Sequence, residues 1–311
     1  MIQNSLFFCP WIFRLVFCLL TIAMVSCGDS NHSIEIEEYD NELSLKKVII
    51  ALKANKQPAS MLVEKQDLEN YLSTKLDRPV EVIIPSDSSV VVESFRNGTL
   101  DLGYLSSTDA ARNLSQETAD ILLVHLKNGK PHYKSIWLTK KEKTYQSIDE
   151  LKGKPVAFAS RSSTSGFLIP TWDMMKRGLV GNETSLTDFF SLTLYGTGYV
   201  SAVEKVLSGE VEAAAVSDYV YRGDNKYLDD TQKERLRVFQ EQGPVPAHTL
   251  CVRSTMSEKD RKIIKEALLQ MNEDNADLRD RIFNGKLISV VADEHLKVTR
   301  EALEFQKKLK P

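Results

Sequence analysis

Four hydroxyl-bearing residues and a glycine stand together in the run Ser162–Gly166 (SSTSG), directly after Arg161. A strand-like apolar run precedes them and a helix-like run follows. The hydroxyls of Ser163, Thr164 and Ser165 would stand beside backbone N–H groups that the first turn of a helix leaves without partners. Together they make a dense, electrically neutral set of donors, which suits an oxyanion. Gly166 would let a ligand approach the backbone closely.

A simpler interpretation is that Ser163 or Thr164 only caps the helix. A cap needs only one hydroxyl, whereas this run has four. The residue types alone still leave the cap and the anion site equally open. A hydrogen bond to a charged group contributes roughly 1.5–3 kcal/mol, so four or five would supply about 6–15 kcal/mol before the cost of association. Micromolar binding needs about 8 kcal/mol net, so this run could form most of a site but not all of one.

The elements that would position this run alternate along the chain between short apolar strands and amphipathic helices. We expect strands at 47–52, 80–84, 100–105, 121–126, 133–139, 155–159, 191–195, 211–216, 236–240 and 249–253. We expect helices at 59–76, 88–95, from 107, 147–151, 201–207, 257–273 and 295–308. This alternation indicates βαβ units, mainly parallel sheets and two α/β lobes of about 100 residues each. Ligands of such sheets bind at the carboxyl ends of the strands, where the Ser162–Gly166 run would lie.

The N-terminus reads as a secretory signal that ends in a lipidation site. Leu15–Val25 is apolar except for Thr21, and it is too short for a bilayer span of about 20 residues. Met24–Cys27 resembles the bacterial lipobox, which implies cleavage before Cys27 and acylation of its thiol. Residues 1–26 would then be the signal peptide, and residues 27–44 the lipidated cysteine and an acidic, flexible tether.

Cysteine content and charge exclude several classes of protein. Cys9 and Cys18 would leave with the signal and Cys27 would carry lipid, so Cys251 remains without a disulfide partner. The 311 residues carry a formal net charge of −3, which argues against a nucleic-acid partner. The five histidines of the chain show no metal-binding spacing, so we expect no metal and no cofactor.

Four sequence runs together resemble the substrate-binding proteins of phosphonate, phosphite and phosphate ABC transporters, the PhnD-like family. Residues 163–170 (STSGFLIP) are close to the family's STSG-x-L-x-P signature. The runs SIDELKGK, SGEVEAA and NGTLDLGY resemble three further family segments, and the likeness covers about residues 45–285. It implies a type II periplasmic-binding-protein fold, with two α/β lobes, a hinge and a ligand cleft between the lobes.

The same resemblance implies a set of ligand-binding positions. Ser163, Thr164 and Ser165 match the family's donors to the phosphonate oxygens, and Gly166 completes that signature. Tyr199 stands where the family usually has a histidine, Ser88 where it has a pocket tyrosine, and Tyr104 beside the position of another. His248 stands where aminoethylphosphonate binders carry an acidic residue, so an aminoalkylphosphonate is not the expected ligand. Arg161 either reaches a bound anion or lies in solvent.

We therefore expect a lipid-anchored, monomeric solute-binding protein on the outer side of a bacterial membrane. It would capture a small phosphorus oxyanion for an ABC permease and catalyse nothing. Residues 45–138 and 243–311 would form lobe 1, and residues 139–242 lobe 2, with the hinge crossings near Trp137–Lys140 and Glu241–Pro246, where Gly243, Pro244 and Pro246 break regular structure.

Two alternatives come from other classes of protein. A sensory binding protein would present the same ligand to a membrane kinase. A serine hydrolase would use Ser163 or Ser165 before the helix, where an oxyanion hole could form, although the chain lacks the Gly-x-Ser-x-Gly elbow.

The lipobox interpretation predicts the behaviour of a Cys27→Ser variant. Because the thiol is the site of acylation, the variant should stay an unlipidated and largely unprocessed precursor. Metabolic labelling with a radioactive fatty acid, compared with wild type, measures this. Equal labelling of the two proteins would rule the lipobox out.

Overall fold

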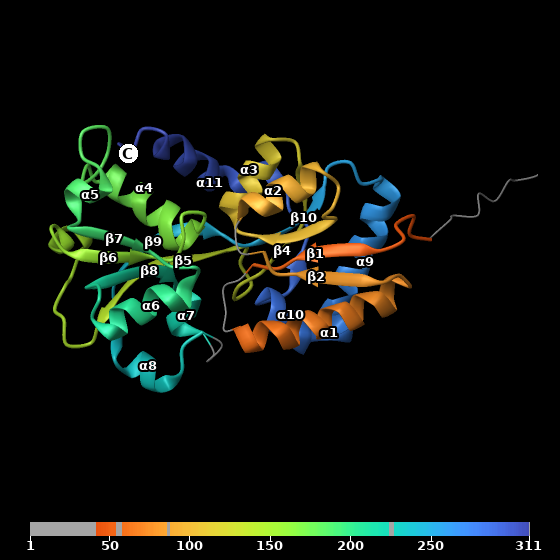
Figure 1. Ribbon diagram of the computed structural model, residues 1–311, viewed down its shortest axis with the longest axis horizontal. Coiled ribbons are helices and arrows are strands. Elements are labelled where there is room, and N and C mark those ends of the chain that lie inside the picture. Colours follow the sequence, from red (N-terminus) through yellow and green to blue (C-terminus); the bar gives the residue numbers. More distant parts are fainter. Residues whose placement is uncertain (1–41, 54–57, 86–87, 224–226, 311) are drawn as a thin grey trace, which may run out of the picture. The chain divides into compact units, whose positions relative to one another are not determined.

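Two β-sheets, each covered by helices, make up the described part of the chain (Figure 1). The computed structural model describes residues 42–53, 58–85, 88–223 and 227–310, and residues 41–311 form one compact unit. The expected signal peptide, Cys27 and the tether up to residue 41 lie outside the described residues. Within those residues, no helix is both long enough and apolar enough to cross a bilayer.

The first sheet has six strands in the order β11-β4-β10-β3-β1-β2. They are β1 (Val48–Ala51), β2 (Val80–Ile83), β3 (Leu102–Leu105), β4 (Ala119–His125), β10 (Thr249–Arg253) and β11 (Leu287–Ile288). Its helices are α1 (Pro58–Leu76), α2 (Ser88–Arg96), α3 (Ser107–Ser115), α9 (Glu258–Asp274) and α10 (Ala276–Phe283). We call this sheet and its helices the first lobe.

The second sheet has five strands in the order β7-β6-β8-β5-β9. They are β5 (His132–Lys140), β6 (Pro155–Phe158), β7 (Leu192–Tyr195), β8 (Ala213–Ser217) and β9 (Leu236–Pro246). The helices of this second lobe are the 3₁₀ turn η1 (Ile148–Leu151), the π-helical turn η2 (Thr164–Leu168), α4 (Ile169–Lys176), α5 (Leu186–Phe189), α6 (Tyr199–Ser208), α7 (Asp218–Arg222) and α8 (Asp230–Glu234).

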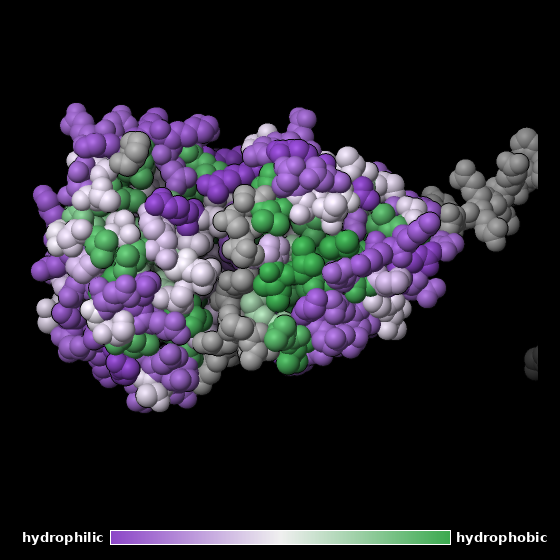
Figure 2. Space-filling view, in the orientation of Figure 1, coloured by the Kyte–Doolittle hydropathy of each residue, from purple (hydrophilic) through white to green (hydrophobic). Residues whose placement is uncertain are grey.

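Each sheet is buried on both faces, which explains why its strands are apolar without alternation. In β1, Val48 and Ile50 pack into one core cluster while Ala51 packs into another on the opposite face. In β8, Ala214 and Ala215 divide between two clusters in the same way. In Figure 2 hydrophilic side chains cover most of the visible face of the second lobe, and the widest apolar area lies over the first lobe. Side chains can therefore reach solvent mainly from the helices and loops.

The expectation of mainly parallel sheets is only partly right. The pairs β1–β2, β1–β3, β6–β7 and β6–β8 are parallel, as the βαβ pattern predicted. The strands that lead into and out of the second lobe, β4, β5, β9 and β10, pair antiparallel with their neighbours. In the first sheet this arises because β10, which returns from the second lobe, lies between β3 and β4 and runs opposite to both. In the second sheet β5, which enters the lobe, runs opposite to β8 and β9.

The first connection between the lobes lies several residues before its expected place, and the second directly follows its expected place. Because β5 begins at His132, the chain leaves the first sheet between residues 126 and 131, not at Trp137–Lys140. It returns at Ala247 and His248, since β9 continues through Pro246. Regular pairing is interrupted at Gly243 and Pro244, since the register of β9 against β5 shifts between the pairs Tyr133–Val245 and Ser135–Gln242. The strand continues past this irregularity because β9 is an edge strand, where prolines are tolerated.

The helix after the Ser162–Gly166 run begins as a π-helical turn. Leu168 N–H donates to Ser163 O at 3.0 Å, one residue further back than in an α-helix. Pro170 has no N–H to continue the ladder, so backbone carbonyls behind it need other donors. Ser165 O accepts from Ser135 Oγ at 2.6 Å, and Gly166 O accepts from Ala159 N at 3.1 Å. Carbonyl groups that the helix does not use, because Pro170 has no N–H, therefore bond to β5 and to the end of β6.

A third connection between the lobes is α11 (Ala292–Gln306), which packs against α3 on one side and against α4, β9 and η2 on the other (Figure 1). Leu296 belongs to a first-lobe core cluster and Ala302 to a second-lobe cluster. The chain then reaches Lys310, whose N–H donates to Gly181 O at 2.9 Å in the second lobe. The last helix therefore belongs to both lobes, whereas the sequence placed it with the first.

A Leu296→Ala variant tests this bridging role. The side chain is 0% exposed, so its truncation should lower the free energy of unfolding by about 2–5 kcal/mol. Lys297→Ala, exposed on the same helix, is the control and should stay within about 0.5 kcal/mol of wild type. Urea unfolding measures both, and indistinguishable midpoints for the two variants would contradict the packing described for α11.

Candidate ligand-binding site

Two similar hydroxyl runs lie where a parallel strand ends and a helix begins, one in each lobe. Ser162-Ser163-Thr164 follows β6 in the second lobe, and Ser106-Ser107-Thr108 follows β3 in the first. Each run starts its helix with a serine cap: Ser163 Oγ accepts from Gly166 N at 2.9 Å, and Ser106 Oγ accepts from Asp109 N at 3.1 Å. Both helix starts therefore direct backbone N–H groups toward the carboxyl ends of the strands.

The cap and the anion site are not exclusive interpretations, because different hydroxyls of the second-lobe run have different roles. Ser163 is the cap. Thr164 and Ser165 are 1% and 0% exposed, yet neither hydroxyl caps the helix. Their partners lie on other elements, so they are the hydroxyls that a helix cap does not explain.

Thr164 joins the two lobes. Its Oγ1 accepts from Thr108 N–H at 3.0 Å and lies 2.8 Å from Thr108 Oγ1. Ser107 Oγ donates to the same oxygen at 3.1 Å and itself accepts from Thr299 Oγ1 of α11 at 3.1 Å. Nearby, Ser106 Oγ donates to Ser162 O at 3.1 Å. The first turns of α3 and η2 thus face each other across the interlobe contact.

Ser165 belongs to a buried group of tyrosines. Its Oγ lies 2.9 Å from Tyr199 OH and accepts from Tyr133 OH at 3.4 Å. Tyr219 OH donates to Tyr199 OH at 3.4 Å, and the rings of Tyr133 and Tyr219 are 5.1 Å apart. These hydroxyls extend the set of neutral donors that begins in the Ser163–Ser165 run.

The first lobe adds an aromatic group to this cluster. The His248 ring lies 5.4 Å from Tyr104 and 6.3 Å from Tyr133, measured between centroids, and His125 lies 6.0 Å from His248. Tyr104 OH lies 2.9 Å from His125 Nδ1. His248 Nδ1 is buried and has no hydrogen-bond partner within the described part of the chain. It is a polar atom that a ligand could satisfy.

The cluster is electrically neutral at neutral pH. Burial, with a smaller contribution from the charges of Lys127 and His295, lowers the pKa of His125 to about 3. Burial, and then the charges of His125 and Lys53, hold the pKa of His248 well below its usual value. Burial likewise raises the pKa of Tyr104, Tyr133 and Tyr219 well above the usual tyrosine value. The protein therefore offers dipoles here instead of charges.

Gly166 is required by the protein's own packing. A Cβ at this position would lie 2.4 Å from Ala159 Cβ and 2.9 Å from Ser163 Oγ. We expected a ligand to approach the backbone of Gly166 closely. In the structure Ala159, directly after β6, and the Ser163 cap approach it instead. Glycine lets the hydroxyl run lie directly on the sheet.

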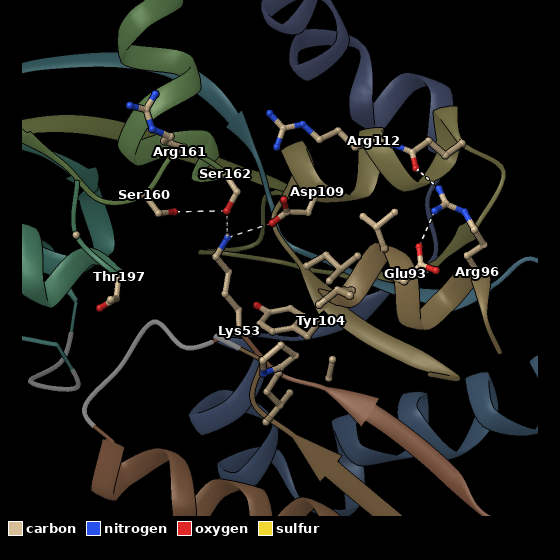
Figure 3. Close-up of a pocket in the computed structure, with 18 residues that line it drawn as sticks. Lys53, Glu93, Arg96, Tyr104, Asp109, Arg112, Ser160, Arg161, Ser162 and Thr197 are labelled. Atoms are coloured by element: carbon tan, nitrogen blue, oxygen red, sulfur yellow. Dashed lines mark hydrogen bonds and ion pairs between the residues drawn. The ribbon is translucent and has the colours of Figure 1, made fainter. Parts of the chain in front are cut away.

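An open cavity of about 800 Å³ lies next to the two hydroxyl runs, between the lobes. Lys53, at the end of β1, stands in it between the lobes: its Nζ is 3.2 Å from Asp109 Oδ2 and 3.4 Å from Ser162 Oγ (Figure 3). Tyr104, Ser160 and Arg161 also line this cavity. The cavity is where a ligand held at the hydroxyl runs could extend toward solvent.

The structure brings most of the expected site residues together. Ser163, Thr164, Ser165, Gly166, Tyr104, Tyr199 and His248 all belong to the buried region between the lobes or border it. Arg161 is exposed at the cavity and stacks on Tyr195, with its guanidinium carbon 4.0 Å from the ring centroid. Ser88 begins α2, and its side chain lies outside what the structure describes.

Several residues of the site were not found from the sequence. Ser106, Ser107 and Thr108 could have been found, because they repeat the Ser-Ser-Thr order of residues 162–164 at an equivalent strand-to-helix junction. Tyr133 and His125 carried no local signal, since a tyrosine or histidine in a strand is common. Only the connection at residues 126–131 brings those two side chains to the interlobe region.

Comparison with known proteins identifies the family. Residues 50–295 match the family of periplasmic substrate-binding proteins of phosphonate ABC transporters. The chain belongs to this family. The resemblance seen in the four sequence runs is therefore confirmed, and the family is one of transport proteins, not of enzymes.

A curated relative and two solved structures support the assignment. The phosphate-import protein PhnD of Mycolicibacterium smegmatis is 26% identical over 212 residues, which cover 65% of this chain and 63% of that protein. The alignment thus spans just under two thirds of that relative's length. A binding protein component of an ABC phosphonate transporter from Pseudomonas aeruginosa matches with a TM-score of 0.74 and 15% identity, over 84% of this chain and 87% of its own.

PhnD1 of Prochlorococcus marinus, solved in complex with methylphosphonate, matches with a TM-score of 0.73 and 18% identity, over 85% of this chain and 99% of its own. These likenesses confirm the expected periplasmic-binding-protein fold with two α/β lobes.

The lowered pKa of His125 predicts how stability depends on pH. In the unfolded chain this imidazole takes up a proton near pH 6.5, whereas in the folded protein it stays neutral down to about pH 3. The free energy of unfolding should therefore fall as the pH is lowered through this window, by up to about 1.4 kcal/mol per pH unit from this group. His125→Asn should remove that share of the slope, as measured by urea unfolding between about pH 4.5 and 6.

The control is His132→Asn, which changes an exposed histidine of β5 and should keep the wild-type slope. If the His125→Asn and wild-type curves stay parallel over this window, His125 is not held neutral in the folded protein.

Proposed function

We propose that this protein captures a phosphorus oxyanion between its two lobes, outside the cytoplasm, and delivers it to an ABC permease. The observation that carries the proposal is the facing pair of helix starts. Hydroxyls and N–H groups of residues 106–108 and 163–166 converge from both lobes, and Thr164 and Ser165 have no role in capping. Donors that come from both lobes bind most strongly when the lobes close on the ligand.

Neutral donors suit a ligand that must later be released. A buried cation would attract any anion, whereas fixed hydroxyl and amide dipoles favour an oxyanion whose oxygens match their positions. Phosphate and methylphosphonate each present several oxygens around one phosphorus atom. The names of the relatives connect the family with both ligands, since one imports phosphate and another was solved with methylphosphonate.

The contacts of the two candidate serines support a binding role over hydrolysis. Ser163 Oγ is occupied as a cap, and Ser165 Oγ contacts the hydroxyls of Tyr133 and Tyr199. Within the described residues, neither serine hydrogen-bonds to a histidine that could act as its general base. We propose that the protein acts without catalysis, as a monomer attached to the membrane through lipid on Cys27.

Variants of Thr164 and Ser165 test the ligand site. Thr164→Val and Ser165→Ala each remove a donor to a buried anion, so each should weaken binding of methylphosphonate and phosphate by about 10- to 150-fold. Isothermal titration calorimetry measures the affinities, and a thermal melt of the same samples reports folding.

Thr164→Ser keeps the hydroxyl and should bind within a few-fold of wild type. Ser208→Ala removes an exposed hydroxyl at the end of α6 and serves as a control outside the site. Wild-type affinity combined with a lowered melting temperature in both hydroxyl-deleted variants would mean that the run is structural and would refute the proposed site.

A further inference from the structure

The charged residues that line the interlobe cavity are not balanced. Four of its lining side chains are cationic and two are anionic: Lys53, Arg96, Arg112, Arg161, Glu93 and Asp109. Two of the cations are paired, since Arg96 Nη1 lies 2.6 Å from Glu93 Oε2 and Lys53 Nζ lies 3.2 Å from Asp109 Oδ2. The other two, Arg112 and Arg161, make no ion pair with any residue drawn in Figure 3.

The two unpaired guanidinium groups come from opposite lobes. Arg112 lies on α3 of the first lobe, and Arg161 lies between β6 and η2 of the second. Both line the cavity. In Figure 3 the Arg112 side chain extends toward the middle of the view above Lys53, whereas the Arg161 side chain lies on the opposite side with its guanidinium directed away from Arg112. If the lobes move together, the two positive charges repel each other and oppose closure. An anion bound between them would attract both and favour closure.

Arg161 is also held in place for such a contact. Its guanidinium carbon lies 4.0 Å from the centroid of the Tyr195 ring, so the group lies over the ring, and its N–H groups form no ion pair with any described residue. A stacked guanidinium loses little freedom when it pairs with a planar or tetrahedral anion, which favours Arg over Lys in this role.

The size of the cavity points to a ligand larger than a bare oxyanion. About 800 Å³ lies toward the upper end of the range for small-molecule sites, roughly 300–1,000 Å³. Ser162 and Tyr104 belong both to this cavity and to the surroundings of the hydroxyl runs. A ligand whose phosphorus group is held at the hydroxyl runs would therefore extend its substituent toward Arg112 and Arg161.

We propose that the natural ligand is an organophosphorus compound with a second acidic group, a carboxylate or a phosphate, and that Arg112 and Arg161 form the subsite for this second anion. The proposal rests on the proposed function, because it assumes that the hydroxyl runs hold the phosphorus group. It names the class of substrate within that function and excludes cationic substituents such as an aminoethyl group.

A matched pair of ligands tests the proposal. Phosphonopropionate and propylphosphonate have similar length, but only the first ends in a carboxylate. Titration calorimetry with the wild-type protein should show phosphonopropionate binding about 10-fold more tightly, since each hydrogen bond to a charged group contributes measurably. Aminoethylphosphonate should bind more weakly than propylphosphonate.

Variants of Arg112 and Arg161 test whether these two residues cause the preference for phosphonopropionate over propylphosphonate. Arg112→Gln and Arg161→Gln should each reduce the ratio of the two affinities, and the double variant should bring it close to one. Arg161→Glu should reverse the order, so that aminoethylphosphonate binds more tightly than phosphonopropionate. Arg177→Gln removes a charge from the exposed surface of α4, where the side chain pairs with Asp173, and should keep the wild-type ratio.

Two results would overturn the proposal while the proposed function stands: equal binding of phosphonopropionate and propylphosphonate to wild type, or a preference that persists in the double variant. If phosphate, methylphosphonate, propylphosphonate and phosphonopropionate all fail to bind the wild-type protein, the proposed function is wrong as well.

Discussion

The buried hydroxyl of Thr164 is the point on which the two lobes depend, because a buried polar group needs a hydrogen-bond partner. Ser107 and Thr108 of the other lobe supply that partner. The bonds are neutral and few, so they hold the lobes in register without making their contact strong. An oxyanion presented to the same donors would replace weak bonds by charge-assisted ones. In the proposed function, ligand capture and lobe contact therefore use one set of atoms.

Charge is distributed in layers around that point. The aromatic cluster contains neutral groups, since burial keeps His125 and His248 unprotonated and the tyrosines protonated. The Lys53–Asp109 ion pair lies beside the hydroxyl runs. The cationic side chains Arg112 and Arg161 line the cavity further out. An inner cation would hold any anion tightly and oppose its release, whereas an outer one attracts anions and remains screened by salt. In the proposals above, the hydroxyl runs hold the phosphorus group, while Arg112 and Arg161 attract anions and bind the second acidic group.

The parts of the fold set by local pattern were predictable from the sequence, and those set by long-range pairing were not. The strand-to-helix junction at Ser163–Gly166 was found because strand, hydroxyls and glycine are neighbours in the chain. Its partner run at Ser106–Thr108 has the same local signal, a Ser-Ser-Thr run between a strand and a helix, but the contact between the two helix starts is visible only in the folded chain. The second lobe connection was expected at Glu241–Pro246 and lies directly after it, whereas the first was expected at Trp137–Lys140, which lies inside β5. No local pattern in β5 marks the lobe to which the strand belongs.

The two helix starts differ at one position, and this difference indicates which lobe carries the anion. The residue whose N–H bonds to the serine cap is Asp109 in the first lobe and Gly166 in the second. Asp109 is 4% exposed and places a carboxylate at its helix start, where it would repel an oxyanion except for Lys53 beside it. The second-lobe start carries no charge. We therefore propose that an oxyanion would make its strongest contacts with residues 163–166, and that the first lobe would close over it through Ser107, Thr108 and Lys53.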